Sequence, residues 1–124
     1  MTEPKKKEGQ KITRKSAKAK ARRLQNLVVE KLHEWWPGFE DGDIRPAIMG
    51  ESGVDIKLSP AASVLIPFDF ECKSQETASI WAWMAQAEKN SWEPDRVPAL
   101  VFTRSRGKVY VCLALDDFLE VVEK

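Results

Sequence analysis

Asp55, Glu71 and Lys73 are the residues whose types and spacing most clearly point to chemistry. Glu71 and Lys73 stand two residues apart at the end of an apolar stretch, so on a strand both project from the same face. Cys72 lies between them and projects from the other face, together with Phe70. Two carboxylates can hold a divalent cation, and a nearby lysine can supply positive charge beside a phosphodiester. The pattern therefore predicts a metal-assisted site for phosphodiester hydrolysis.

The expected cation is Mg²⁺, a hard ion that prefers oxygen ligands. We expect Asp55 and Glu71 to bind it through their carboxylates, with the backbone carbonyl of Cys72 as a third ligand. Lys73 would lie near the attacking water or the transition-state phosphate. Asp69 is a spare acid, ranked lower because a proline disturbs the strand just before it. The same charges would also suit the solvated face of a half-exposed hairpin, but a glycine-containing turn before Asp55 favours the metal site.

The elements that must position these residues follow from hydrophobic periodicity and turn signals. Apolar residues recur every three or four positions from Leu24 to Trp35, and Pro37-Gly38 ends that helix. The pattern predicts an α-β-β-β-α-β-β-α order, an α/β fold with a mixed β-sheet flanked by helices. The expected elements are a helix over 16–36, an edge strand in 43–49, a turn at 50–53, a strand over 54–58, a loop at 59–62, a strand over 64–74 with regular pairing from about Phe68, a helix over 77–90, strands over 97–103 and 108–113, and a last helix to Val122 capped by Asp116 or Asp117.

The charge of the chain is divided unevenly between its two ends. Residues 1–23 carry ten basic and two acidic residues, a net charge of +8, whereas residues 24–124 carry ten basic and seventeen acidic residues, a net charge of −7. We expect residues 1–15 to form a disordered basic arm that neutralises phosphates, or one that merely aids solubility, and residues 16–124 to form one domain.

The bulk composition excludes several classes of protein. At 124 residues and 43% hydrophobic content, the chain fits a single soluble globular domain. It has no apolar run long enough for a membrane span and no apolar segment behind its first lysines, so neither a membrane nor a secretory signal is expected. Cys72 and Cys112 have no metal-ligand spacing and are expected to be reduced thiols in the core. No nucleotide-binding or serine-hydrolase motif occurs.

Several further stretches extend the pattern around the two acids. They are Arg22-Arg23-Leu24-Gln25, the run from Met49 to Asp55, Leu58 to Ala62, Pro67 to Lys73, Ile80-Trp81 and Gln86-Ala87. With these motifs the chain, from about residue 16 onward, resembles the archaeal-type Holliday junction resolvases, in particular the small versions carried by phages, within the PD-(D/E)xK nuclease superfamily. The resemblance implies a restriction-endonuclease-like core and a homodimer that cuts two strands of a four-way DNA junction symmetrically, with Mg²⁺ or Mn²⁺. It makes Asp55 and Glu71 metal ligands and Lys73 a catalytic residue.

The resemblance leaves some positions open. Val54 stands where many relatives have the proline before the first acid. Relatives also use an acid from the first helix, for which Glu30 is the candidate and Gln25 and Glu34 are rivals. Ser52 approximately matches a family serine near the scissile phosphate.

Other residues are weighed between a functional and an ordinary surface role. Gln86 in the second helix either reaches the metal-bound water or simply faces solvent. The five tryptophans favour a dimer contact, with stacking on unpaired bases as the sharper alternative. The candidate DNA contacts, each of which could also be an ordinary surface charge, are Arg22, Arg23, Arg45, Ser52, Arg104, Arg106 and Lys108.

These observations favour a magnesium-dependent, junction-resolving endonuclease of DNA recombination that acts as a homodimer. It would work in the cytoplasm, that of the host if the chain is phage-encoded. A repair, restriction or single-strand nuclease would keep the same site with another DNA substrate. A non-catalytic DNA-binding accessory protein of recombination would keep the fold but not the metal dependence.

Overall fold

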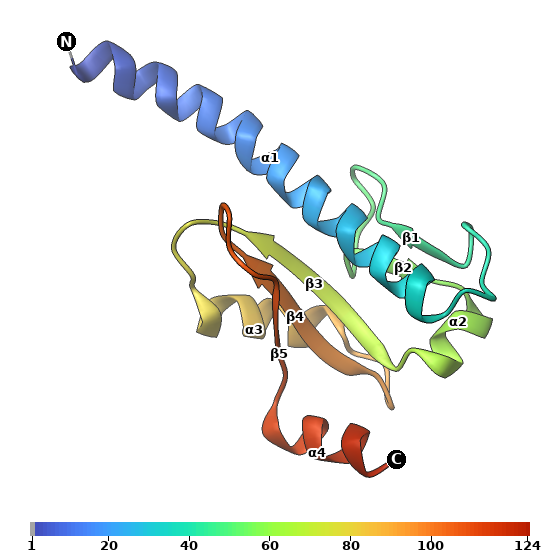
Figure 1. Ribbon diagram of the computed structural model, residues 1–124. Coiled ribbons are helices and arrows are strands. Elements are labelled where there is room, and N and C mark those ends of the chain that lie inside the picture. The colour runs from blue at the N-terminus through green and yellow to red at the C-terminus, as the bar shows by residue number, and fades with distance from the viewer. Residues whose placement is uncertain (1) are drawn as a thin grey trace.

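The computed structural model describes the backbone of residues 2–124 and the side chains from residue 15 onward. Helices flank a mixed β-sheet (Figure 1), which confirms the predicted α/β fold class. The elements, in chain order, are α1 (Thr2–Trp35), β1 (Ile44–Pro46), β2 (Ile56–Leu58), α2 (Pro60–Leu65), β3 (Phe68–Ser74), α3 (Ile80–Asn90), β4 (Val97–Thr103), β5 (Tyr110–Cys112) and α4 (Leu115–Glu123).

The strands form a two-stranded and a three-stranded unit. β1 and β2 pair antiparallel, and the second unit has the order β3-β4-β5. β3 is parallel to β4 over its whole length, from Phe68 opposite Val97 to Ser74 opposite Thr103, and β4 is antiparallel to β5. The backbone N–H of Asp55, just before β2, donates to the carbonyl of Phe70 in β3 over 3.0 Å. This bond ties the two units together beside the candidate site.

Alternation along β3 places Phe70 and Cys72 on one face of the strand and Glu71 and Lys73 on the other. Phe70 and Cys72 belong to the buried core, which α1 covers with its own apolar residues. The buried core residues are Leu24, Val28, Leu32, Ile44, Ile56, Ala62, Ile66, Phe70, Cys72, Ala99 and Val101. Glu71 and Lys73 therefore point to the opposite face, which α3 covers by packing on β3 and β4. The sequence pattern predicted that these two pairs of side chains project from opposite faces of the strand, and the structure confirms that alternation.

Several element boundaries differ from the expected ones. The expected loop at 59–62 is the start of α2, because Ser59 caps that helix: its hydroxyl accepts from the N–H of Ala62 over 3.2 Å, and Pro60 occupies the first helical turn. The strand after it begins at Phe68, where regular pairing was expected. The last helix starts after Ala114 with no side-chain cap, so the expected cap at Asp116 or Asp117 is wrong.

The ends of the other elements also shift. α1 begins at Thr2 rather than near Ser16, α3 begins at Ile80, and β1, β2 and β5 are shorter than expected. β4 has the predicted bounds, 97–103. The division into a basic arm, 1–15, and a domain, 16–124, stays a prediction, and the side chains of residues 1–14 lie outside the described part of the chain.

Both cysteines are free thiols, Cys72 buried in the core and Cys112 half-buried in β5. Of the helices in residues 2–124, none combines the length and the apolar character that crossing a membrane requires.

Candidate active site

Asp55 is held where the β1–β2 unit meets β3. Its backbone donates to Phe70, as described, and its carbonyl accepts from the N–H of Ala47 over 2.8 Å. Its carboxylate oxygen Oδ2 accepts from the backbone N–H of Cys72 over 2.7 Å. The first acid is therefore bonded directly to the strand that carries Glu71 and Lys73.

Glu71 is an acidic residue that is buried, with 4% of its surface exposed. The residue paired with it in β4 is the fully buried Leu100. Burial, and then the negative charge of Asp55, raise the pKa of Glu71 to about 7. The negative charge of Asp55 acts on Glu71, so the two carboxyl groups lie near one another, and their joint role as metal ligands stays a prediction.

Lys73 and the backbone of Cys72 complete the cluster. Lys73 is half-buried, and its positive charge counteracts the rise in the pKa of Glu71. The N–H and C=O of one strand residue point to the same side, so the carbonyl of Cys72 faces the edge where its N–H meets Asp55. Burial, followed by the charges of Asp55 and Glu71, raises the pKa of the Cys72 thiol, which stays protonated.

Asn90, the last residue of α3, contacts the site although no motif in the sequence singles it out. Its side-chain amide donates to Oε1 of Glu71 over 3.2 Å and lowers the pKa of that carboxyl group. Asn90 follows the buried Trp83 and Ala87 at helical spacing, so its place on the inner face of α3 could have been read from the sequence.

Asp69, the spare acid, is already paired. Its Oδ1 accepts from Nε of Arg96 over 3.0 Å and its Oδ2 from the hydroxyl of Ser91 over 2.9 Å. Arg96 also donates to the carbonyls of Ser63 and Phe68, each over 2.8 Å. Asp69 therefore anchors the start of β4 to β3 and leaves Glu71 as the acid beside Asp55.

The candidate site residues on α1 and on α3 lie in different parts of the structure. Gln86 stands one turn before Asn90 on α3, at the margin of the site, and its side chain is exposed. Glu30 and Glu34 instead line an open groove beside β1, with His33 and Arg45. The structure does not bring Glu30 or Glu34 to the carboxylate pair, because α1 covers the face of β3 opposite to Glu71. Gln25, the other rival, is half-buried on α1.

Four basic side chains line a groove beside the end of β3. They are Lys20, Arg23, Arg104 and Arg106, and the groove, of about 390 Å³, runs between α1 and the β4–β5 turn. Ser74 lines it as well, directly after Lys73 in the chain. Lys108 lines an adjoining pocket with Arg104 and Tyr110. The structure thus brings Arg23, Arg104 and Arg106 together, and it adds Lys20.

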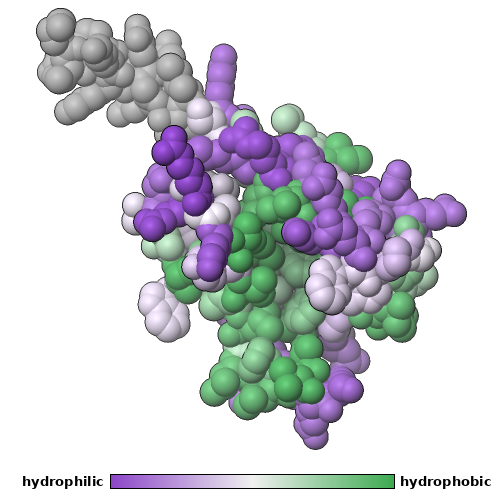
Figure 2. Space-filling view, viewed as in Figure 1, coloured by the Kyte–Doolittle hydropathy of each residue, from purple (hydrophilic) through white to green (hydrophobic). Residues whose placement is uncertain are grey.

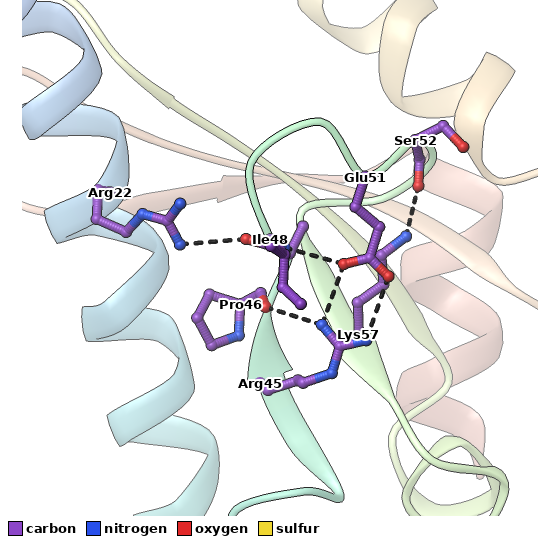
Figure 3. A network of polar contacts seen from close by, with 8 residues as sticks. Arg22, Arg45, Pro46, Ile48, Glu51, Ser52 and Lys57 are labelled. Atoms are coloured by element: carbon purple, nitrogen blue, oxygen red, sulfur yellow. Dashed lines mark hydrogen bonds and ion pairs between the residues drawn. The ribbon is translucent and has the colours of Figure 1, made fainter.

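The remaining candidate DNA contacts lie in a separate network around the turn before Asp55 (Figure 3). Arg22 donates to the carbonyl of Ala47 over 3.1 Å. Both terminal nitrogens of Arg45 bond to Glu51, over 3.1 and 3.2 Å, and this contact lowers the pKa of Glu51 to about 2. The carbonyl of Ser52 accepts from the ammonium group of Lys57. In this arrangement Arg22 and Arg45 serve the loop itself.

The donor set of the site suits a hard divalent cation. Two carboxylates of like charge lie side by side, one of them buried, and a backbone carbonyl faces the same edge. Burial, and then repulsion by Asp55, raises the pKa of Glu71, and a bound cation would offset both effects. Among the side chains that the structure describes, those of residues 15–124, no three His, Cys, Asp or Glu gather as a metal site, so a third protein ligand would come from the backbone.

Comparisons with known proteins show the family to which the chain belongs. The family described as "Phage putative PDDEXK endonuclease" matches residues 5–124, nearly the whole chain. A search of curated proteins found no match, and neither did a search of solved structures. An Asp, a Glu and a Lys at the junction of β2 and β3 are the residues for which such nucleases are named. The chain therefore belongs to this family of phage PD-(D/E)xK endonucleases.

Proposed function

We propose that this nuclease is a Mg²⁺- or Mn²⁺-dependent endodeoxyribonuclease that resolves four-way DNA junctions as a homodimer. The observation that carries the metal-dependent part is the carboxylate pair of Asp55 and Glu71 with Lys73 on the same row of β3. The junction specificity is supported by the resemblance of residues 16–124 to the junction resolvases, and a two-fold dimer suits a substrate with two equivalent strands to cut.

Each side chain of the site has a distinct part in this proposal. Asp55, held by the N–H of Cys72, and Glu71, held by Asn90, would bind the cation together with the carbonyl of Cys72. When bound, the cation polarises the phosphodiester and favours the ionisation of water. Lys73 places an ammonium group where negative charge develops on the phosphate during cleavage.

The basic groove supplies the path for the DNA backbone. Lys20, Arg23, Arg104 and Arg106 line it, and it begins at Ser74, one residue beyond Lys73. Phosphates that lie in this groove would lead the strand toward the end of β3. Binding would then depend steeply on salt, because each neutralised phosphate releases counterions.

The test is a cleavage assay on a synthetic four-way junction and on a linear duplex of the same sequence, each with Mg²⁺ and with EDTA. We expect paired nicks in the junction only, and only with the metal. Asp55→Asn should lower the rate by at least about 100-fold without weakening junction binding in EDTA. Glu40→Gln, which changes an exposed acid away from the site, is the matched control and should cut at the wild-type rate.

The other outcomes separate the competing functions. Equal cutting of junction and duplex would keep the metal site and make the protein a nuclease for other DNA. Binding without cutting in either buffer would indicate a recombination accessory protein. Wild-type cleavage by Asp55→Asn would show that the proposed mechanism is wrong.

A further inference from the structure

α4 carries an apolar stripe that the rest of the described chain leaves uncovered. Leu115, Phe118, Leu119 and Val122 follow the spacing of one helical face, yet 70%, 49%, 52% and 65% of their surfaces are exposed. No residue of α4 is buried, and only Asp117 and Val121 are even half-buried. A helix this short gains its stability mainly from packing, so its apolar face needs a partner.

The stripe continues into an apolar groove next to β5. The groove, of about 670 Å³, is lined by residues of α3, β4, β5 and α4, including Ile80, Phe102, Tyr110, Val111, Leu115 and Phe118. β5 is the last strand in the order β3-β4-β5, so the groove lies at the edge of the sheet. Figure 2 shows the hydrophobic surface over α4, at the bottom of the view, continuing upward toward the sheet.

We infer that α4 and the groove beside β5 form the surface through which two copies of this chain associate. The surface can meet a second copy of itself, because α4 exposes an apolar face and, through Leu115 and Phe118, also lines the apolar groove beside β5. Under a two-fold axis, each α4 enters the groove of the other copy and the contact closes at two chains.

The exposed apolar area over α4 and β5 is of the size expected for contact with a second copy of the chain. The exposed parts of Tyr110, Val111 and the four stripe residues of α4 amount to an area on the order of 600 Å², against the roughly 800 Å² that each partner buries in a standard interface. Single exposed apolar residues are ordinary, but a contiguous patch of this extent marks an interaction site.

The charges of α4 argue against two other occupants. Asp116, Asp117, Glu120 and Glu123 lie on the same short helix as the stripe. Four carboxylates would repel a nucleic-acid backbone, and an amphipathic helix that binds an anionic membrane surface carries lysines and arginines on its polar face instead.

This inference rests on one part of the proposed function, the homodimer, and it identifies the surface through which that homodimer would form. The first measurement is sedimentation equilibrium of the full chain without DNA, for wild type, Leu119→Glu and Val64→Glu. Val64 on α2 is the matched control, since it is an apolar residue with 80% exposure outside the patch. We expect wild type and Val64→Glu to have twice the monomer mass of 14.1 kDa. Leu119→Glu should raise the dimer dissociation constant by roughly 100-fold.

Hydrogen exchange of the unmodified chain gives a second measurement that needs no variant. The amides of 115–123 should become more protected as the protein concentration rises, whereas those of α2 should not change. A monomeric wild type at every concentration, or a Leu119→Glu dimer as tight as wild type, would overturn the inference.

Either failure is distinguishable from failure of the proposed function. Metal-dependent nicking depends on Asp55 and Glu71 and can be assayed whether or not the chain associates. A dimer that never cuts DNA would contradict the proposed function and leave the association surface intact.

Discussion

The backbone N–H of Cys72 donates to Oδ2 of Asp55 over 2.7 Å, so the first acid of the site is bonded to the strand that carries the second. This bond holds two like charges together, Asp55 at the start of β2 and Glu71 in β3. Burial, and then the negative charge of Asp55, disfavours the ionised form of Glu71 and raises its pKa. The ionised form of Glu71 therefore costs stability in this buried position beside Asp55.

The stability of the metal-free protein should fall as the pH rises from about 5 to about 8. The pKa of Glu71 is raised to about 7 from its ordinary 4.5, so the folded state binds more protons than the unfolded state across this interval. The expected loss of unfolding free energy, measured by denaturant titration in EDTA, is about 2 kcal/mol.

Glu71→Gln should remove this dependence, and added Mg²⁺ should reduce it in the wild type. Glu88→Gln, an exposed acid on α3, should leave it unchanged. The lowered pKa of Glu51, Glu76 and Asp43 adds stability that is lost only as the pH falls below their ordinary values, so their effect lies in a lower window. Stability that rises between pH 5 and pH 8 would contradict the assignment.

Asn90→Ala should move the acidic limb of the pH–rate profile of cleavage to higher pH. The amide of Asn90 stabilises the ionised form of Glu71, and its removal raises the pKa of that group further. At neutral pH we expect a roughly 3–10-fold lower rate, recovered at higher pH. Lys89→Ala, at the exposed neighbouring position, should keep the wild-type profile. A loss of rate that is equal at every pH would indicate a different role for Asn90.

Arg96→Ala should destabilise the fold strongly, because it strands the carboxylate of Asp69 in a place where only about 15% of that side chain is exposed. It also removes two bonds to backbone carbonyls. The expected loss in a denaturant titration is about 3 kcal/mol. Lys31→Ala breaks the exposed pair with Glu34 and should cost less than about 1 kcal/mol. If the two variants were equally stable, the pairing of Asp69 would not matter to the fold.

Arg104→Ala should weaken junction binding more than Arg45→Ala, although each variant removes one positive charge. Arg104 lines the basic groove, whereas the guanidinium of Arg45 is held by Glu51. In a salt series followed by fluorescence anisotropy in EDTA, Arg104→Ala should lower the slope of log K against log salt by about 1. Equal effects of the two variants would mean that the groove is not the path of the DNA.

The reactive strand could be read from the sequence because its pattern is local. The alternation of Phe70, Glu71, Cys72 and Lys73 decides which side chains share a face, whatever the rest of the chain does. The bounds of β4 could be predicted for a similar reason, since seven residues from Val97 form one apolar run between turn signals.

What the sequence did not reveal depends on residues that are far apart in the chain. Asn90 meets Glu71 across 19 positions, and Arg96 meets Asp69 across 27. No periodicity encodes such pairs, because they follow from how α3 and β4 dock on β3. Glu30 was expected near the two acids for the same reason, and it lies instead on the side of the sheet that α1 covers. Helical spacing gives the face of a helix, but not which face of the sheet that helix covers.

The register of β3 also decides whether the core and the candidate site can form together. Because its side chains alternate, a slip by one residue would turn Phe70 and Cys72 toward α3 and bring Glu71 and Lys73 into the apolar core under α1. A misregistered chain would thus lose its core and its cutting residues at once.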